Sequence, residues 1–373
     1  MMKKKIAVLH YAFLKGGAES LCAWTLQALQ NDFDVTLFTL ADININILNE
    51  MYGTNVEIDR ISVKSFFPDW VLPLVEYYYS NFCFLNAVSY HIFMRYFKKF
   101  KDSFDLIIST YNEMDFGKKG IQYIHYPGMV QSRIRGIISN FSDARMKSNI
   151  SLTNSEFTRN VISEMYDITS HIIRPPVFSD FPNICWKDKE LGFICSARLA
   201  QQKDIEGIIE ILRKVRHRGY KIHLHVTYIG YNKKYEKRIK KLQKDYSTWI
   251  TLHKNMNRKE YIQLLAQHKF SIHNRKEPFG IVVAEQLEAG CIPFVRDIGG
   301  QVEIIGHHNF LMFKNKNEAV KKIVSMLSSK GKQKEMLHFL TLRAKQFSQK
   351  KFMAEMRAVV LDFFKKIKKP DKS

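Results

Sequence analysis

Short apolar segments alternate with helical segments along the whole chain, and this alternation constrains the fold more than any other feature. In the first half the apolar segments are residues 6–13, 34–40, 105–110, 121–127 and 149–154. In the second half they are residues 191–198, 221–230, 248–254, 269–274 and 291–295. Because strands that alternate with helices form parallel sheets covered on both faces, the sequence predicts an α/β fold.

The chain divides into two such halves. Its 373 residues suffice for two domains. A proline-rich stretch without hydrophobic periodicity, residues 174–190, separates the halves and is expected to be a linker. We therefore expect two doubly wound Rossmann-like domains, over residues 1–173 and 191–350, facing each other across a cleft. A basic helix over residues 351–373 is expected to pack back on the N-terminal domain or to touch lipid.

The chain is strongly basic, with a formal net charge of +22. Such a charge suits nucleic acid, an anionic membrane surface or phosphate-bearing substrates. No zinc-finger, RNP-type or homeodomain-like pattern is present, so nucleic acid is not expected as a partner. Residues 66–101 are rich in aromatic side chains and end in basic ones, a composition that fits either a membrane interface or a core helix.

The cysteines and the hydropathy of the sequence indicate the cellular compartment of the protein. The five cysteines are odd in number and have no paired spacing, which favours a reducing compartment and argues against a zinc site or a disulfide framework. The apolar run near the N-terminus is short and contains His10, and no run approaches the roughly 18 apolar residues of a transmembrane helix. We expect a cytoplasmic protein, and the charge leaves open a peripheral position on the cytoplasmic membrane face.

One stretch, KEPFGIVVAEQLEAGCIPFVRDIGGQ, places carboxylates around a turn. Glu277 precedes Pro278, which disfavours a helical conformation, so Glu277 is expected on a loop. A short helix is expected over residues 281–289, with Glu285 about one turn inside it. Free N–H groups at such a helix start can bind an oxygen-rich ligand, and carboxylates accept hydrogen bonds from hydroxyls. The stretch therefore predicts a site for a polyhydroxylated, phosphate-bearing ligand.

Five separated stretches resemble, in order, the motifs of the family-4 glycosyltransferases, which are retaining enzymes of the GT-B fold with nucleotide-sugar donors. The resemblance covers most of the chain. Its most specific part is the last stretch, where two glutamates flank seven residues with an internal Phe-Gly. The five stretches are residues 15–19 (KGGAE), 123–127 (YIHYP), 152–158 (LTNSEFT), 196–204 (SARLAQQKD) and 277–285 (EPFGIVVAE).

The resemblance implies roles for particular residues. Glu277 and His125 would contact the transferred sugar, while Arg198 and Lys203 would stabilise the charge on the departing diphosphate. Together these four are the candidate catalytic residues. Glu285 would accept hydrogen bonds from the nucleotide ribose. The backbone of the glycine-rich loops and of the Phe-Gly turn would bind phosphate and sugar oxygens, which makes donor-binding candidates of Gly16, Gly17, Phe279, Gly280, Ile281, Gly299 and Gly300.

Within that family, YIHYP, FGIVVAE and AGCIP most resemble enzymes that extend lipid-linked oligosaccharides with mannose. The resemblance therefore predicts a retaining transferase that moves a hexose, with mannose favoured, to a glycan or lipid-linked acceptor. GDP-mannose is the favoured donor, and a UDP-sugar is the alternative. The five stretches contain no Asp-x-Asp pair, so neither a divalent metal nor another cofactor is implied.

Two other interpretations stay open. The first keeps the fold and changes the reaction, to a nucleotide-sugar epimerase or a glycan phosphorylase. The second is a non-catalytic protein that binds a membrane surface or a polyanion, for which the net charge and residues 66–101 are the support.

Overall fold

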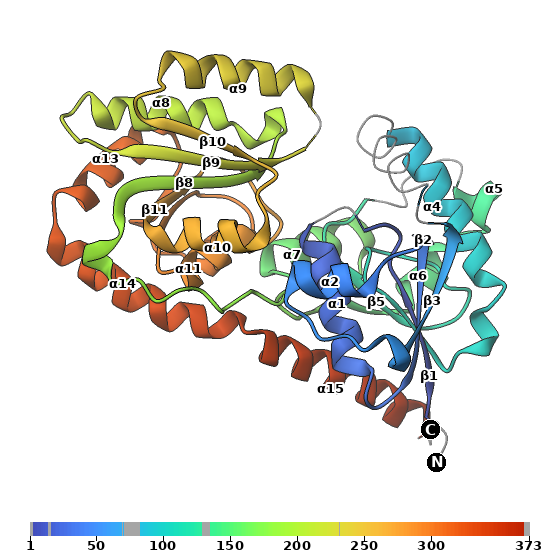
Figure 1. The fold of residues 1–373 in the computed structure, drawn as a ribbon. Helices are drawn as coiled ribbons and strands as arrows, with labels where there is room; N and C mark the ends of the chain where they lie inside the picture. Colours follow the sequence, from blue (N-terminus) through green and yellow to red (C-terminus); the bar gives the residue numbers. More distant parts are fainter. Residues whose placement is uncertain are drawn as a thin grey trace. The chain divides into compact units, whose positions relative to one another are not determined.

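The computed structural model describes residues 3–13, 16–68, 70, 83–128, 135–230 and 232–368, apart from the side chains of residues 83–87, 135–136 and 367–368. The chain forms two compact units (Figure 1). The first comprises Met1–Pro176 and Gln349–Ser373, and the second comprises Val177–Ser348. Each unit contains one parallel sheet with helices on its faces, which confirms the prediction of an α/β fold with two Rossmann-like units.

The first unit contains a seven-stranded sheet in the order β3-β2-β1-β4-β5-β6-β7, and every neighbouring pair is parallel. The central strand β1 pairs with β2 on one side and with β4 on the other, so the strand order reverses beside it. The strands are β1 (Lys5–Leu9), β2 (Asp34–Ala41), β3 (Ile61–Phe67), β4 (Leu106–Ser109), β5 (Ile121–Ile124), β6 (Ile150–Thr153) and β7 (Ser170–Ile172).

Two apolar cores cover the two faces of this sheet. Alternate residues of β1 point to opposite faces: Ile6 and Val8 join one core, and Ala7 and Leu9 join the other. The first core includes residues of α1 and α15, and the second includes residues of α4 and α7. The helices are α1 (Gly17–Leu29), α2 (Ile45–Tyr52), α4 (Cys83–Lys98), α5 (Arg135–Ser139), α6 (Asp143–Lys147), α7 (Glu156–Tyr166) and α15 (Gln349–Lys368).

The aromatic segment 66–101 contributes to the second core. Tyr90, Phe93, Met94 and Phe97 of α4 are at most 1% exposed, so these side chains form protein core and do not face a lipid surface. Residues 69 and 71–82 of this segment lie outside the described residues. Across the part of the chain that the structure describes, no helix combines the length and apolar character needed to cross a membrane.

The second unit contains a six-stranded parallel sheet in the order β10-β9-β8-β11-β12-β13. Helices α8 and α9 lie over one face of this sheet, and α10 and α11 lie on the other (Figure 1). The strands are β8 (Glu190–Arg198), β9 (His223–Ile229), β10 (Ile250–Lys254), β11 (His268–His273), β12 (Ile292–Arg296) and β13 (Met312–Phe313). The helices are α8 (Ile205–Arg216), α9 (Lys233–Asp245), α10 (Arg258–Gln267), α11 (Ile281–Glu288), α12 (Gln301–Ile304), α13 (Lys316–Leu327) and α14 (Lys330–Ala344).

Each of the ten predicted apolar segments overlaps a strand, whereas β3, β7 and β13 were not predicted. All three are outer strands of their sheets, and the fourth outer strand, β10, was predicted. An outer strand can expose more of its length, and one that does lacks the continuous apolar run of a buried parallel strand. The sequence ISVKSFF of β3, with Lys64 and Ser65 in its middle, is an example.

Candidate functional site

The predicted donor-site residues of the second unit follow the carboxyl ends of its parallel strands. Arg198 ends β8, the turn around Glu277 follows β11, and the Gly299–Gly300 pair follows β12. Strands β8, β11 and β12 are neighbours in the sheet, so these loops emerge side by side. This is the edge at which open α/β sheets bind ligands.

An ion pair joins two of the predicted residues. Lys203 Nζ donates a hydrogen bond to Glu277 Oε1, although the two residues lie on different loops. Their side chains are 19% and 23% exposed, so the pair is partly screened from water but open to a ligand. The candidate cation for the diphosphate thus contacts the candidate carboxylate for the sugar.

Asp204 fixes the loop that carries Lys203. Its side chain caps α8 by accepting from the Gly207 backbone N–H at 3.1 Å, and it also accepts from Asn274 Nδ2 at 2.5 Å. Asn274 directly follows β11. The loops after β8 and β11 are therefore tied together next to the Lys203–Glu277 pair.

Gly299 and Gly300 are required because their backbone closely approaches the backbone at Glu277. Gly300 N donates to Glu277 O at 2.8 Å, and Gly299 forms a bridge with Glu277. A Cβ atom at Gly300 would lie 2.1 Å from Pro278 O, and one at Gly299 would lie 2.4 Å from Glu277 O. Only residues without a side chain permit this contact, and the contact determines where the backbone carrying Glu277 lies.

Gln301, which the family resemblance places with Gly299 and Gly300 in a loop near the diphosphate, secures the same turn. It is fully buried, and its Nε2 donates to Arg275 O at 2.5 Å and to Arg296 O at 3.0 Å. These bonds connect the loop after β11 with the loop after β12. Its position directly after the glycine pair was the available sequence signal.

Helix α11 begins at Ile281, as predicted, and its amino end faces the Phe-Gly turn. The cap residue Gly280 has φ 98°, a left-handed conformation that favours glycine, and it offers no side-chain cap. The first N–H groups of the helix can therefore bind ligand oxygens. Phe279 is itself 4% exposed and packs in the core, so it presents its backbone and not its ring to a ligand.

Glu285 lies on α11 and is 8% exposed. Its Oε1 accepts from Arg258 Nη1 at 3.0 Å, and its Oε2 accepts from the Tyr261 hydroxyl at 3.0 Å. Both partners belong to α10 and were not predicted from the sequence. They hold the carboxylate in one orientation, and each oxygen retains a further lone pair for a ligand hydroxyl.

Arg198 is exposed at the end of β8. Among the described residues, no hydrogen bond or ion pair involves its guanidinium group, unlike the ammonium group of Lys203. A guanidinium group that stays in solvent can turn toward an anion without breaking an existing bond.

The remaining candidates belong to the first unit. His125 follows β5: its backbone N–H donates to Asn112 Oδ1 at 2.7 Å, and its Nε2 lies 3.0 Å from Thr110 O. The carbonyl accepts from Nε2–H, so Nδ1 retains a lone pair. Burial lowers the His125 pKa to about 4, so the ring is neutral at neutral pH. Asn154 of the NSEF motif donates to His125 O at 2.9 Å.

Two further motifs each contain the N-cap of a helix. Gly16 is the N-cap of α1 in an extended conformation, without a side-chain cap, and Gly17 starts that helix, while Lys15 lies outside the described residues. Ser155 caps α7 by accepting from Thr158 N at 3.0 Å.

One Asp-x-Asp sequence, Asp32-Phe33-Asp34, does occur in the chain, outside the five motifs. It runs into the first residue of β2, at the amino end of that strand and away from the carboxyl edge of the sheet. Asp32 Oδ2 accepts from Arg357 Nε of α15 at 2.6 Å, so its carboxylate fastens the C-terminal helix.

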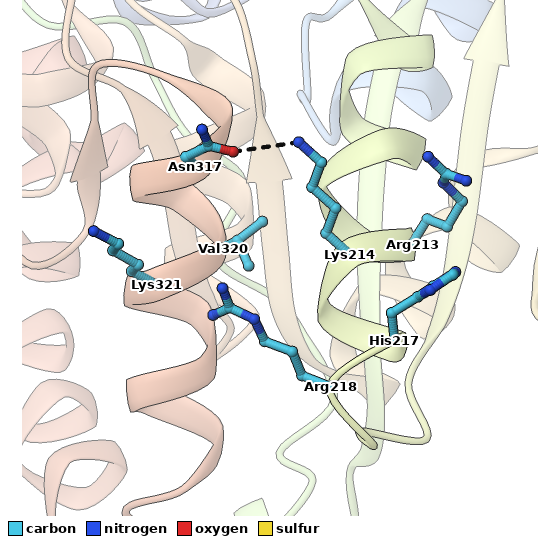
Figure 2. A pocket seen from close by; sticks show the side chains of 7 residues that line it. All are labelled: Arg213, Lys214, His217, Arg218, Asn317, Val320 and Lys321. Carbon is cyan, nitrogen blue, oxygen red and sulfur yellow. Dashed lines mark hydrogen bonds between the residues drawn. The ribbon is translucent and has the colours of Figure 1, made fainter.

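A separate hollow of about 440 Å³ lies between α8 and α13 (Figure 2). Its walls carry several cations from the end of α8 and from α13, and Lys214 Nζ lies 3.2 Å from Asn317 Oδ1. None of the predicted site residues lines it. The lining residues are Arg213, Lys214, His217, Arg218, Asn317, Val320 and Lys321.

Comparisons with known proteins agree with this architecture. Residues 179–339 match the family model of glycosyl transferases group 1, which places that domain within the second unit. No curated protein matches the sequence significantly. The match supports a glycosyltransferase domain in the second unit.

Several solved structures share the fold. HepE of Anabaena, solved with UDP and glucose, has a TM-score of 0.70 at 14% identity, covering 96% of this chain and 100% of its own. The pneumococcal O-GlcNAc transferase GtfA, solved with UDP and GlcNAc, has a TM-score of 0.69 at 11% identity, covering 97% and 99%. WaaG, a glycosyltransferase involved in lipopolysaccharide biosynthesis, has a TM-score of 0.62 at 13% identity, covering 95% and 99%.

Proposed function

We propose that the protein is a retaining glycosyltransferase that moves a hexose from a nucleotide-diphosphate sugar to a glycan or lipid-linked acceptor. The Lys203–Glu277 ion pair beside the uncapped start of α11 is the observation that carries this proposal. A cation, a carboxylate and free amide groups lie together there. These are the groups that a diphosphate joined to a sugar requires.

The proposed mechanism assigns a step to each group. Arg198 and Lys203 bind the diphosphate and stabilise the negative charge that grows as its bond to the sugar breaks. Lys203 leaves its contact with Glu277 when the phosphate arrives, which frees the carboxylate to accept from sugar hydroxyls. The acceptor hydroxyl attacks from the face that the diphosphate leaves, and the departing phosphate oxygen takes its proton. Glu277 positions the sugar and forms no covalent bond.

The next part of the proposal concerns the nucleotide base of the donor. The motif resemblance favours GDP-mannose, while HepE and GtfA were each solved with UDP. Glu285 serves either base equally, because it would bind the ribose. We therefore propose a nucleoside-diphosphate sugar as the donor class, with GDP-mannose and UDP-sugars as the two members to compare.

A thermal-shift panel tests the proposed function. GDP, UDP, ADP and their common sugar conjugates are added singly, without metal. One nucleotide is expected to raise Tm, because ligand at about 100 times its Kd stabilises the native state by about 2.7 kcal/mol. Absence of any shift in a folded sample would contradict the proposal. Product analysis with and without acceptor then separates transfer from epimerisation, and phosphate dependence identifies a phosphorylase.

Reversing the charge at Arg198 is expected to weaken binding of the nucleoside diphosphate by at least about tenfold, since a charge-assisted bond to phosphate contributes about 1.5–3 kcal/mol. Calorimetric titration of Arg198→Glu with the preferred nucleotide measures this change. Arg213→Glu is the matched control, because it makes the same charge change on the same unit beside the separate hollow of Figure 2. Equal affinities in the two variants would remove Arg198 from the site.

A further inference from the structure

Four side chains with metal-ligand chemistry converge at the edge of the second sheet opposite to the proposed donor site. Glu190, His223 and His268 are the first residues of β8, β9 and β11. These strands are adjacent in the sheet. His225 follows two residues after His223, so both rings point to the same face.

The ligand atoms of this cluster lie close together. His223 Nε2 is 3.1 Å from Glu190 Oε2 and 3.3 Å from His268 Nε2. One ligand atom from each of Glu190, His223, His225 and His268 lies within 4.8 Å of the others. Bonds of about 2.0–2.1 Å to a tetrahedral Zn²⁺ place neighbouring ligands about 3.3 Å apart. The separations around His223 therefore match the edges of such a site.

Hydrogen bonds already orient two of the rings. His268 is fully buried, and its Nδ1 donates to Leu264 O at 2.7 Å, which leaves the Nε2 lone pair directed at the cluster. His253 Nε2 lies 3.1 Å from His225 Nδ1 and holds that ring. Such outer contacts are typical of metal-binding histidines.

The backbone also makes room for the cluster. A Cβ atom at Gly192 would lie 2.1 Å from His223 Nε2 and 2.5 Å from two other atoms of that ring. The His223 ring therefore rests directly on the glycine of the neighbouring strand, at the point where its Nε2 meets Glu190 and His268. Any larger residue at position 192 would displace the ring.

We propose that Glu190, His223, His225 and His268 bind one divalent transition-metal ion of the zinc, cobalt or nickel type. Three imidazoles and one carboxylate suit these ions, and four protein ligands are typical of a structural site. The ion would fasten the amino ends of β8, β9 and β11. It would play no part in sugar transfer, because Glu277 and Lys203 follow the opposite ends of these strands.

Cobalt titration of the tag-free, metal-stripped full-length protein tests this proposal. We expect one Co²⁺ per chain with the strong visible absorption of four-coordinate Co²⁺, displaced by one equivalent of Zn²⁺. His223→Gln is expected to weaken binding by at least about tenfold and to remove this absorption. Its ring is 30% exposed, and Glu190→Gln, with a side chain 46% exposed, provides a second variant that leaves the core intact.

His338→Gln is the matched control, because His338 is exposed on α14 of the same unit and lies outside the cluster. It is expected to bind Co²⁺ like the unaltered protein. Circular dichroism confirms that each variant is folded. Failure of the unaltered protein to bind Co²⁺, or equal binding and equal absorption in His223→Gln, would overturn the proposal and leave a cluster held by hydrogen bonds alone.

Discussion

Replacing Glu277 by glutamine is expected to lower kcat by roughly 10²–10³-fold, the range observed when one preorganised electrostatic contact in an active site is removed. Glutamine keeps the shape and still accepts from Lys203, but it loses the negative charge that strengthens hydrogen bonds from sugar hydroxyls. Steady-state kinetics with the donor identified by thermal shift measure the loss. Donor affinity is expected to change much less than kcat, because Arg198 and Lys203 bind the diphosphate.

Two controls make that result interpretable. Glu335→Gln makes the same chemical change at an exposed position of α14 and is expected to leave kcat unaltered. The Tm of Glu277→Gln should remain near that of the unaltered protein, because the Lys203–Glu277 pair is partly exposed and such pairs contribute little to stability. Near-normal turnover in Glu277→Gln would exclude this residue from the mechanism.

Adding one methyl group at Gly300 is expected to abolish most of the activity without touching a side chain of the site. The φ of Gly300 is −69°, which alanine adopts readily, so the effect is purely steric. The new Cβ would lie 2.1 Å from Pro278 O and 2.9 Å from Phe279 Cα, and both are backbone atoms. The turn that carries Glu277 must therefore shift, at a cost of about 1–3 kcal/mol in stability. Kinetics and thermal unfolding of Gly300→Ala measure the two effects.

Gly331→Ala is the control for this prediction. A Cβ atom there meets only Ser329 Oγ, at 3.9 Å, and the residue lies in α14, where alanine favours the helix. That variant is expected to be fully active and slightly more stable. If Gly300→Ala kept full activity and normal Tm, the close backbone contact between the two loops would not position Glu277.

Much of the donor side could be predicted because its signals are local. A Pro after Glu277, a Phe-Gly turn and a following apolar helix each have conformational consequences within a few residues. For the same reason the start of α11 at Ile281 was predicted correctly. By contrast, Arg258 and Tyr261, which hold Glu285, lie 27 and 24 residues earlier in the chain. Contacts over such separations leave no pattern in one sequence.

The outer strands illustrate another limit. Buried strands such as β8 and β11 show continuous apolar runs, because helices cover both of their faces. Strand β3 has one buried residue in seven, and β13 has only two residues, so neither carries such a run. Their pairing with β2 and β12 follows from the sheet already formed beside them.

The sequence alone determined the class of fold, the two halves and the turn that carries Glu277, because hydrophobic periodicity and backbone preferences act between near neighbours in the chain. Only the tertiary structure decided which side chains meet. The Lys203–Glu277 pair joins residues 74 positions apart. The histidine cluster likewise exists only because β8 pairs with both β9 and β11. Sheet pairing brings distant loops and strand ends together, and that requires the whole fold.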